Sequence, residues 1–239
     1  MAEHGLELHS EGAALLLDHS TLVVADLHLG CEAALEYEGL SLPRMQTHRL
    51  RQLLTDMVKR LRPEALVVAG DLKHNFSRNL TQEWNDIVDF MRSISALTEV
   101  SVVRGNHDNY LNAILSELQI PLRKEIRIGR HRIMHGHSGM VQGPTVMGHL
   151  HPCMTLSDDV GGRIKQPCFL HNRTSSTLVL PAMSIVSPGV DVVRRSVLDT
   201  FSPVLGRLKL GSFSPIIFVD GQPLVFPTLR EIWADTRRD

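Results

Sequence analysis

The sequence is poor in several features that mark large classes of protein. It has three cysteines, Cys31, Cys153 and Cys168, an odd number without a CxxC spacing. This usage argues against a disulfide framework and favours a reducing compartment. No apolar run is long enough to span a bilayer, and the acidic Glu3 and Glu7 stand where a signal peptide would be basic. We therefore expect a cytoplasmic protein without a membrane partner.

An excess of charge of either sign is also missing. The formal net charge is -1, from 25 Lys and Arg residues against 26 Asp and Glu residues. Such a balance argues against a chain held on nucleic acid or a membrane by bulk electrostatics, while leaving room for a local basic groove. Hydrophobic content of 43% and charged content of 21% are those of an ordinary globular protein. The length predicts one domain over residues 1–239.

Histidine is plentiful, with 13 residues, and the most informative ones follow short apolar runs. The segment Arg104-Gly105-Asn106-His107-Asp108 follows two β-branched residues, so a buried strand ends in a tight turn that presents polar side chains. Asn106 offers a neutral oxygen ligand, His107 an imidazole, and Asp108 a carboxylate able to orient that imidazole. Alone, this segment is equally compatible with an ordinary polar turn.

The first half of the chain alternates predicted strands with predicted helices, and the second half is rich in short strands. Strand, helix, strand order with polar residues at the strand ends is typical of α/β proteins, whose ligand sites lie at those ends. No element is predicted for residues 185–213. The predicted strands are 13–17, 21–25, 65–69, 99–103, 124–128, 132–135, 145–147, 167–171, 177–180, 215–219 and 224–226, and the predicted helices are 45–61, 84–94 and 110–118.

Five of these strand ends carry polar side chains of related chemistry. Imidazole and carboxylate oxygen without thiolate form a ligand set for first-row divalent metals such as manganese, iron or zinc. A single hydrolytic zinc ion needs only about three protein ligands. Two ions that share a carboxylate would use far more of the set, and such pairs stabilise the attacking and leaving oxygens in phosphoryl transfer. The side chains are Asp26, His28, Asp71, His74, Asn106, His107, Asp108, His135, His137, His149 and His151.

Five ordered motifs within this set resemble the signature motifs of the calcineurin-like metallophosphoesterase superfamily. The resemblance covers residues 22–152 and is closest to the archaeal SbcD-related phosphoesterases and to compact bacterial phosphoesterases associated with DNA ligase and helicase operons. It implies an α/β fold, a four-layer α/β/β/α sandwich of two mixed β-sheets flanked by helices, with the metal site at the C-terminal ends of strands. The motifs are Asp26-Leu27-His28, Gly70-Asp71, Gly105-Asn106-His107-Asp108, His135-Gly136 and Gly148-His149-Leu150-His151.

The resemblance also implies a role for each motif residue. His107 would contact the phosphoryl group and assist the leaving oxygen, with Asp108 as its orienting partner. His74 would bind the substrate phosphate. For His137 two alternatives stay open: it supports a metal ligand, or it lies on the surface without a role. Manganese is the first choice of metal, with iron, zinc, nickel and magnesium as alternatives. One ion would be held by Asp26, His28 and His151, the other by Asn106, His135 and His149, and Asp71 would bridge them.

These features predict an enzyme that hydrolyses phosphodiester bonds through a water activated by two metal ions. Its substrate would be nucleic acid or a nucleotide, as expected for a nuclease or nucleotide phosphodiesterase linked to DNA repair. A small-molecule nucleotide pyrophosphatase or a phosphomonoesterase would use the same ligands, whereas a non-catalytic binding scaffold is expected to have lost some of them. The chain is too short to hold the separate DNA-capping domain of large SbcD-type nucleases, so the resemblance does not imply processing of DNA ends.

Overall fold

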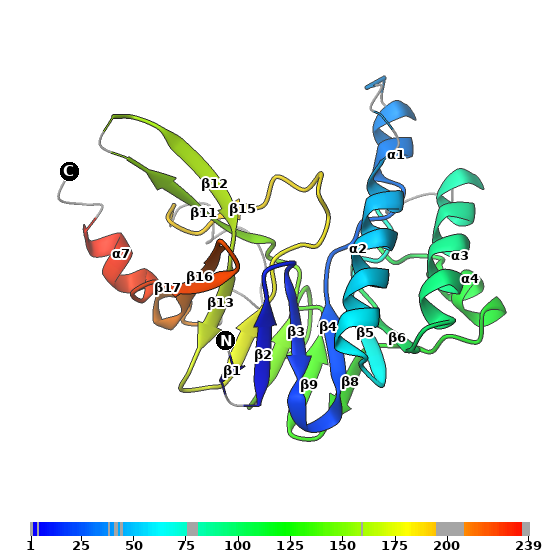
Figure 1. Cartoon of the computed structure of the whole chain (residues 1–239), viewed down its shortest axis with the longest axis horizontal. Helices are drawn as coiled ribbons and strands as arrows, with labels where there is room; N and C mark the ends of the chain where they lie inside the picture. Colours follow the sequence, from blue (N-terminus) through cyan, green and yellow to red (C-terminus); the bar gives the residue numbers. More distant parts are fainter. Residues whose placement is uncertain are drawn as a thin grey trace.

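The computed structural model of the chain has two seven-stranded β-sheets packed face to face, with a three-stranded sheet beside the second (Figure 1). It describes residues 2–3, 5–37, 39–40, 43, 45–75, 81–158, 160–194 and 208–235. The first sheet has the order β1-β2-β3-β4-β5-β6-β7, antiparallel up to β4 and parallel from β4 onward. Its strands are β1 Ala2–Glu3, β2 Leu6–His9, β3 Ala13–Leu16, β4 Thr21–Val24, β5 Ala65–Ala69, β6 Glu99–Val103 and β7 Leu122–Arg123.

The second seven-stranded sheet is also mixed. Its order is β17-β16-β13-β14-β10-β9-β8, with the parallel pairs β14–β10 and β10–β9 at its centre. The three-stranded sheet has the order β12-β11-β15. The strands of these two sheets are β8 Glu125–Ile128, β9 His131–Met134, β10 Thr145–Met147, β11 Pro152–Ser157, β12 Arg163–Pro167, β13 Phe169–Asn172, β14 Thr177–Val179, β15 Val190–Asp191, β16 Ser214–Val219 and β17 Gln222–Val225.

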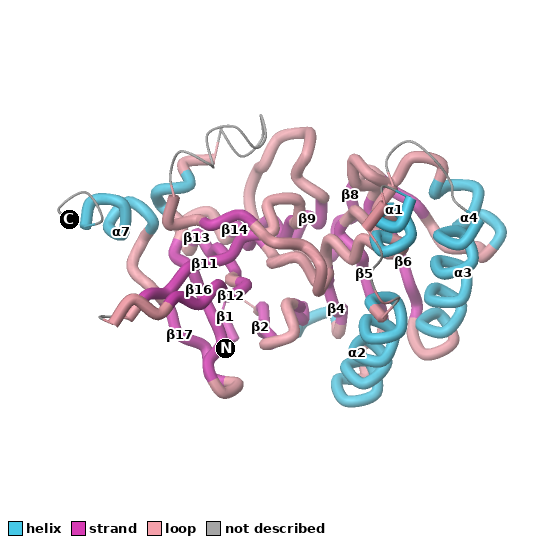
Figure 2. Tube along the Cα trace, turned by 90° about the horizontal axis from the view of Figure 1, so that it is seen from above, coloured by secondary structure: helices cyan, strands magenta, loops and turns pink. Residues whose placement is uncertain are grey.

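Helices cover the outer face of the first sheet and one end of the molecule (Figure 2). The described helices are α1 Cys31–Tyr37, α2 Gln46–Leu61, α3 Thr81–Ser95, α4 Leu111–Glu117 and α7 Leu229–Asp235, with short 3-10 turns at Leu17–His19 and Leu210–Ser212. Helices α2, α3 and α4 lie together against the parallel strands, and α7 lies at the opposite end. In the part of the chain that is described, no helix combines the length and apolar character needed to cross a membrane.

The parallel strands are apolar on both faces because each face contributes to a different core. In β4, Leu22 packs into the core beneath the helices, whereas its neighbour Val23 packs into the core between the sheets. In β5, Leu66 and Val67 divide in the same way. This alternation follows from the two-residue period of a strand and explains why these segments read as continuous apolar runs.

A third core lies on the outer face of the second sheet. The three-stranded sheet and α7 cover it in the described part of the chain, with Leu170 and Ile217 on the sheet side and Leu229 on α7. The predicted α/β sandwich of two mixed sheets with flanking helices is therefore confirmed. The outer layer on this side combines strands with a short helix rather than long helices.

Most predicted elements form at or within two residues of their expected bounds. The structure adds β1, β2, β7, the hairpin β11–β12 and helices α1 and α7, for which no element was predicted. Helices α1 and α7 each span only 7 residues, and β12 exposes most of its side chains. None of these three elements therefore carries a clear apolar stripe. Of the segment 185–213, the structure describes β15 and the 3-10 turn at Leu210–Ser212, while 195–207 lie outside the described residues.

The C-terminal ends of the parallel strands meet at one edge of the sandwich. Asp26, after β4, donates its backbone N–H to the Gly70 carbonyl after β5 at 3.1 Å. Gly148, after β10, donates to the His135 carbonyl after β9 at 3.1 Å. The two sheets are joined at this edge because His135 Nδ1 lies 3.0 Å from the Ala69 carbonyl of β5. The loop after β6 joins them, because the His107 N–H donates to Asp71 Oδ1 at 2.9 Å, so all five motif-bearing loops converge.

Candidate metal centre

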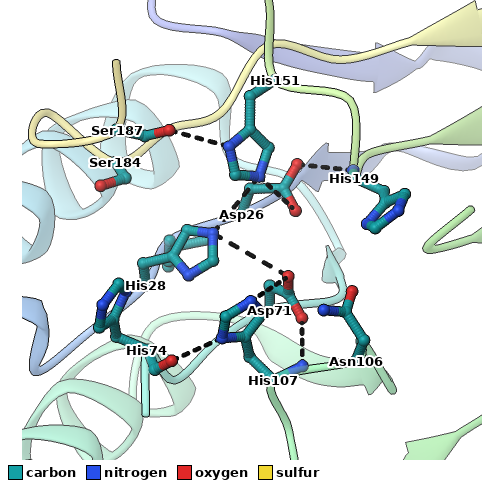
Figure 3. Close-up of polar contacts among 12 residues, drawn as sticks. Asp26, His28, Asp71, His74, Asn106, His107, His149, His151, Ser184 and Ser187 are labelled. Carbon is teal, nitrogen blue, oxygen red and sulfur yellow. Dashed lines mark hydrogen bonds and ion pairs between the residues drawn. The ribbon is translucent and has the colours of Figure 1, made fainter. Parts of the chain in front are cut away.

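Two groups of potential metal ligands lie at the convergence of the loops (Figure 3). The first comprises Asp26, His28, Asp71 and His151, and the second comprises Asp71, His135 and His149, with ligand atoms within 4.8 Å of one another in each group. Asp71 belongs to both. Asn106 adjoins the second group, since its Oδ1 lies 3.0 Å from His135 Nε2. The structure thus brings together all seven predicted ligands, and it could hold two ions with Asp71 between them.

The backbone at these ligands adopts an unusual conformation. Five non-glycine residues of the centre have positive φ, a region that costs roughly 1–2 kcal/mol per residue. Such conformations persist only where the surrounding structure holds them, and they cluster at functional sites. Here cross-loop hydrogen bonds hold them, including the 2.9 Å bond from His28 N–H to the Asp71 carbonyl. The five are Asp26 (φ 56), His28 (φ 48), Asp71 (φ 50), His149 (φ 72) and His151 (φ 48).

Two motif glycines allow close approach to the candidate ligands. A Cβ atom at Gly105 would lie 2.1 Å from Asp71 Oδ1 and 2.3 Å from the Asp71 backbone nitrogen. A Cβ atom at Gly148 would lie 2.6 Å from Asp26 Oδ2. Any larger residue would therefore displace a carboxylate of the centre, which gives these glycines a steric reason beyond their turn geometry.

The hydrogen-bond pattern of His135 fits a metal ligand. Its Nδ1 faces the Ala69 carbonyl, which can only accept, so Nδ1 carries a proton and Nε2 is the nitrogen left for an ion. Nε2 lies 3.4 Å from Asp71 Oδ2 and 3.0 Å from Asn106 Oδ1. Three electron-rich atoms converging in a buried site suit a cation, and an outer hydrogen bond that fixes the tautomer is usual for ligating histidines.

Burial and neighbouring charge set the protonation of the centre. Burial lowers the pKa of His28 and of His149 to about 4 each, so both imidazoles are neutral at pH 7 and keep a lone pair for an ion. Burial would raise the pKa of Asp71, but the hydrogen bond from His135 and nearby histidine charges outweigh it and hold that pKa well below its usual range. Asp71 is therefore ionised, and its carboxylate is available to a cation.

His135 is poised differently from the other two histidines. Burial acts to lower its pKa, but the hydrogen bond to Asp71 and the charges of Asp26 and Asp71 outweigh burial and raise the pKa to about 9. A proton on Nε2 would occupy the lone pair that an ion needs. Metal binding at this group should therefore release a proton and weaken as the pH falls.

Asp108 does not have the predicted role. Its fully buried carboxylate accepts hydrogen bonds from the backbone N–H groups of Gly105 at 2.7 Å, Asp71 at 3.0 Å and Lys73 at 3.2 Å. None of these bonds reaches the His107 ring, whose Nδ1 instead lies 2.6 Å from the His74 carbonyl. The prediction that Asp108 orients His107 is therefore wrong. Asp108 is drawn inward by backbone donors that would otherwise be buried unpaired.

The remaining predicted residues lie around the ligands. The His74 ring stacks on His107 with centroids 5.9 Å apart and also lies 5.4 Å from His28. The His137 ring lies 5.2 Å from His135 and 6.2 Å from His149. His74 thus flanks one side of the centre, and His137 is half-buried beside the second ligand group rather than remote from it.

Comparison with known proteins gives the family. The family model described as calcineurin-like phosphoesterase matches residues 19–165, more than half of the chain. The protein belongs to the calcineurin-like phosphoesterase family. It is accordingly a metal-dependent phosphoesterase, and the family generally uses a pair of metal ions, a requirement that the clustered Asp and His groups fit.

One solved structure agrees with the fold of this calcineurin-like phosphoesterase. The nuclease MPE of Pseudomonas putida superposes with a TM-score of 0.68 over 94% of this chain and 98% of that chain, at 20% identity. The E. coli phosphoesterase Yfce gives a TM-score of 0.39 over 71% of this chain and 83% of that chain, at 17% identity. No curated protein matches the chain.

Two supporting residues of this phosphoesterase escaped the sequence prediction. Ser187 Oγ lies 2.8 Å from His151 Nδ1, on the side of the ring opposite the other ligands. Gln46, fully buried at the start of α2, donates to the carbonyls of Leu27 at 3.0 Å and His28 at 2.8 Å. Ser187 falls in the segment for which no element was predicted, and a glutamine at a helix start carries no signal that it faces a loop.

We predict that Gly105→Ala loses bound metal. Its Cβ would collide with both the carboxylate and the backbone of Asp71, so the shared ligand cannot keep its place. Gly211→Ala is the matched control, since its Cβ would have no neighbour closer than 3.4 Å. Elemental analysis of both purified variants after manganese loading checks this, with circular dichroism to establish folding. Full metal content in folded Gly105→Ala would contradict the geometry.

Proposed function

We propose that this phosphoesterase hydrolyses phosphodiester bonds in nucleic acid or nucleotides at a centre of two divalent ions. The observation that carries the proposal is Asp71, whose carboxylate is common to both ligand groups. In this assignment Asp26, His28 and His151 hold one ion, and Asn106, His135 and His149 hold the other. When bound, the ions supply stabilisation of the phosphoryl oxygens and activation of the attacking water. The donor set, free of thiolate, suits manganese first, with iron, zinc, nickel or magnesium as alternatives.

His107 is the residue we propose to act on the leaving group. Its backbone N–H donates to Asp71 Oδ1 at 2.9 Å, which ties the turn to the bridging carboxylate. Its ring Nδ1 is taken by the His74 carbonyl, and Nε2 points into the centre, 4.0 Å from Asp71 Oδ2. The side chain is 31% exposed, so a substrate can reach it. A protonated Nε2 there can donate to the departing oxygen as the P–O bond breaks.

Two features support a diester of nucleic acid as the substrate. His74 places a second imidazole beside His107, where it can bind a further phosphate oxygen. The carboxyl ends of β6 and β7 present three exposed cations, Arg104, Arg123 and Lys124, at the same edge as the ligands. A strand that continues beyond the scissile phosphate could contact them, despite the near-zero net charge of the whole chain. The Pseudomonas putida neighbour, which matches nearly the full length, is a nuclease. A link to DNA repair rests on the motif resemblance.

The proposal is tested with purified protein and Mn²⁺ on phosphodiesters, phosphomonoesters, cyclic nucleotides, nucleotide pyrophosphates, and single- and double-stranded DNA. We expect hydrolysis of diesters that a chelator abolishes and added Mn²⁺ restores. Turnover confined to pyrophosphates or monoesters would instead identify a small-molecule nucleotide hydrolase that uses the same ligands.

Asp71→Ala should be the most damaging ligand substitution, because one carboxylate serves both ions. We expect this variant to lose both ions, whereas Asn106→Ala should lose mainly one. Metal content per chain, measured on folded protein, distinguishes the two. If Asp71→Ala retained both ions, Asp71 would not be the bridge.

His107→Ala should fold and keep both ions, since we assign His107 to the leaving group and not to a metal. General acid assistance of this kind contributes about 10²–10⁴ in rate, and we expect kcat for a diester to fall by a factor in that range. Stopped-time assays with parallel metal analysis provide the measurement. Loss of a metal ion from the variant would mean that the ligand set is misassigned.

His74→Ala should separate diester from monoester hydrolysis. If His74 binds a diester phosphate, its removal lowers kcat/KM for a diester at least tenfold more than for an activated monoester, with metals retained; a single hydrogen bond to a charged group is worth about 1.5–3 kcal/mol. The two substrates are compared in one buffer with the same variant. Equal losses on both would remove His74 as a reason to prefer a diester.

A further inference from the structure

A buried ion pair lies next to the centre and has no part in the roles proposed so far. Lys73, in the loop after β5, is 0% exposed, and Glu83, in the first turn of α3, is 1% exposed. Lys73 Nζ lies 3.2 Å from Glu83 Oε2. Two charges removed from water are seldom a net gain in stability over apolar residues of the same size. Their presence one residue from His74 points to a positional role.

The pair holds the chain on both sides of His74. Glu83 Oε1 accepts the backbone N–H of Asn75 at 2.8 Å, and Lys73 Nζ donates to the Asn75 carbonyl. The N–H of His74 itself donates to the Leu29 carbonyl at 3.0 Å. Gly30 makes room for this arrangement, because a Cβ there would lie 2.6 Å from Glu83 Cγ. The backbone of His74 is thus held between the first motif loop and α3.

The backbone of His74 in turn controls His107. The His74 carbonyl lies 2.6 Å from His107 Nδ1. A carbonyl can only accept, so Nδ1 carries a proton and Nε2 is the nitrogen that exchanges with substrate. The carboxylate that might have done this, Asp108, is occupied by three backbone N–H groups. The tautomer and direction of the His107 ring therefore depend on where one carbonyl oxygen lies.

We propose that Lys73 and Glu83 are positioning residues for His107. They act through the His74 carbonyl and do not themselves touch substrate or metal. The inference rests on the proposed role of His107 at the leaving group. It explains why a costly buried pair stands beside the centre, and it places a backbone carbonyl where a carboxylate was expected.

Neutral pairs test this without leaving one buried charge alone. The double variant Lys73→Met/Glu83→Met removes both charges and the acceptor for Asn75. The matched variant Lys73→Met/Glu83→Gln removes the charges but keeps an amide oxygen that can accept the Asn75 N–H. We expect the first to lower kcat by at least about tenfold for a diester with a nucleoside leaving group, since small misplacements of catalytic groups can cost about 10²-fold. The second should recover most of that loss.

The leaving group and the metal content provide readouts that a merely structural role would not move. With a 4-nitrophenyl leaving group, which departs without a proton, the loss in Lys73→Met/Glu83→Met should be several times smaller, with KM and both metals unchanged. If this variant does not fold or loses metal, Glu83→Asp replaces it. It keeps the charge but shortens the reach to Asn75, and the same leaving-group dependence is expected.

A double-mutant cycle with His107→Ala distinguishes the positioning role of Lys73 and Glu83 from the role of His107 itself. In the His107→Ala background the Lys73 and Glu83 substitutions should cost nothing further, because residues acting through one group are not additive. An additive loss, or an equal loss for both leaving groups, would overturn the positioning role. A His107→Ala enzyme with unchanged kcat would instead refute the proposed role of His107, before the positioning residues are considered.

Discussion

Every part of the centre depends on the place of one carboxylate. Asp71 Oδ2 faces His135 at 3.4 Å and both His28 and His107 at 4.0 Å, while Oδ1 accepts the His107 backbone N–H. A buried negative charge is unfavourable unless cations or hydrogen-bond donors surround it. The convergence of histidines from separate loops meets that requirement. The same histidines make the site suitable for divalent ions, so one arrangement both stabilises the Asp71 carboxylate and provides metal ligands.

Around this carboxylate, the protein uses backbone groups where side chains might be expected. Asp108 does not act on the substrate side but gathers three N–H groups and so fixes the turn that carries Asn106 and His107. The His74 carbonyl takes the place of a carboxylate behind His107. Burial raises the pKa of Asp108 to about 6, with the Asp71 charge adding to the effect. If the Asp108 carboxylate pointed towards the candidate ligands, its charge would repel that of Asp71 more strongly. This is a physical reason for Asp108 to face the backbone N–H groups instead.

The strained backbone at the ligands fits the same picture. Positive φ at Asp26, Asp71 and His151 shows that these loops depart from strand geometry at the candidate ligands themselves. The cost is borne by a scaffold whose parallel strands are buried on both faces and whose loops are hydrogen-bonded to one another. Gly105 and Gly148 then let neighbouring loops approach within contact of the carboxylates. The well-packed sheets thus hold the loops in a backbone conformation that would be unfavourable in an isolated segment.

The sequence by itself determined the strands, the ordered motifs and the chemistry of the ligand set. Apolar runs such as 65–69 and the polar residues that follow them are local patterns, which can be recognised from one sequence without the tertiary structure. It also led to the family, because the five motifs and their order can be read directly from the sequence. Only the tertiary structure decided which partner each side chain has. Asp108 and His107 are adjacent in sequence but face different ways. Lys73 and Glu83, Gln46 and His28, and Ser187 and His151 meet although they lie 10, 18 and 36 residues apart. Such pairings follow from how strands and helices pack, and no periodicity along the chain encodes them.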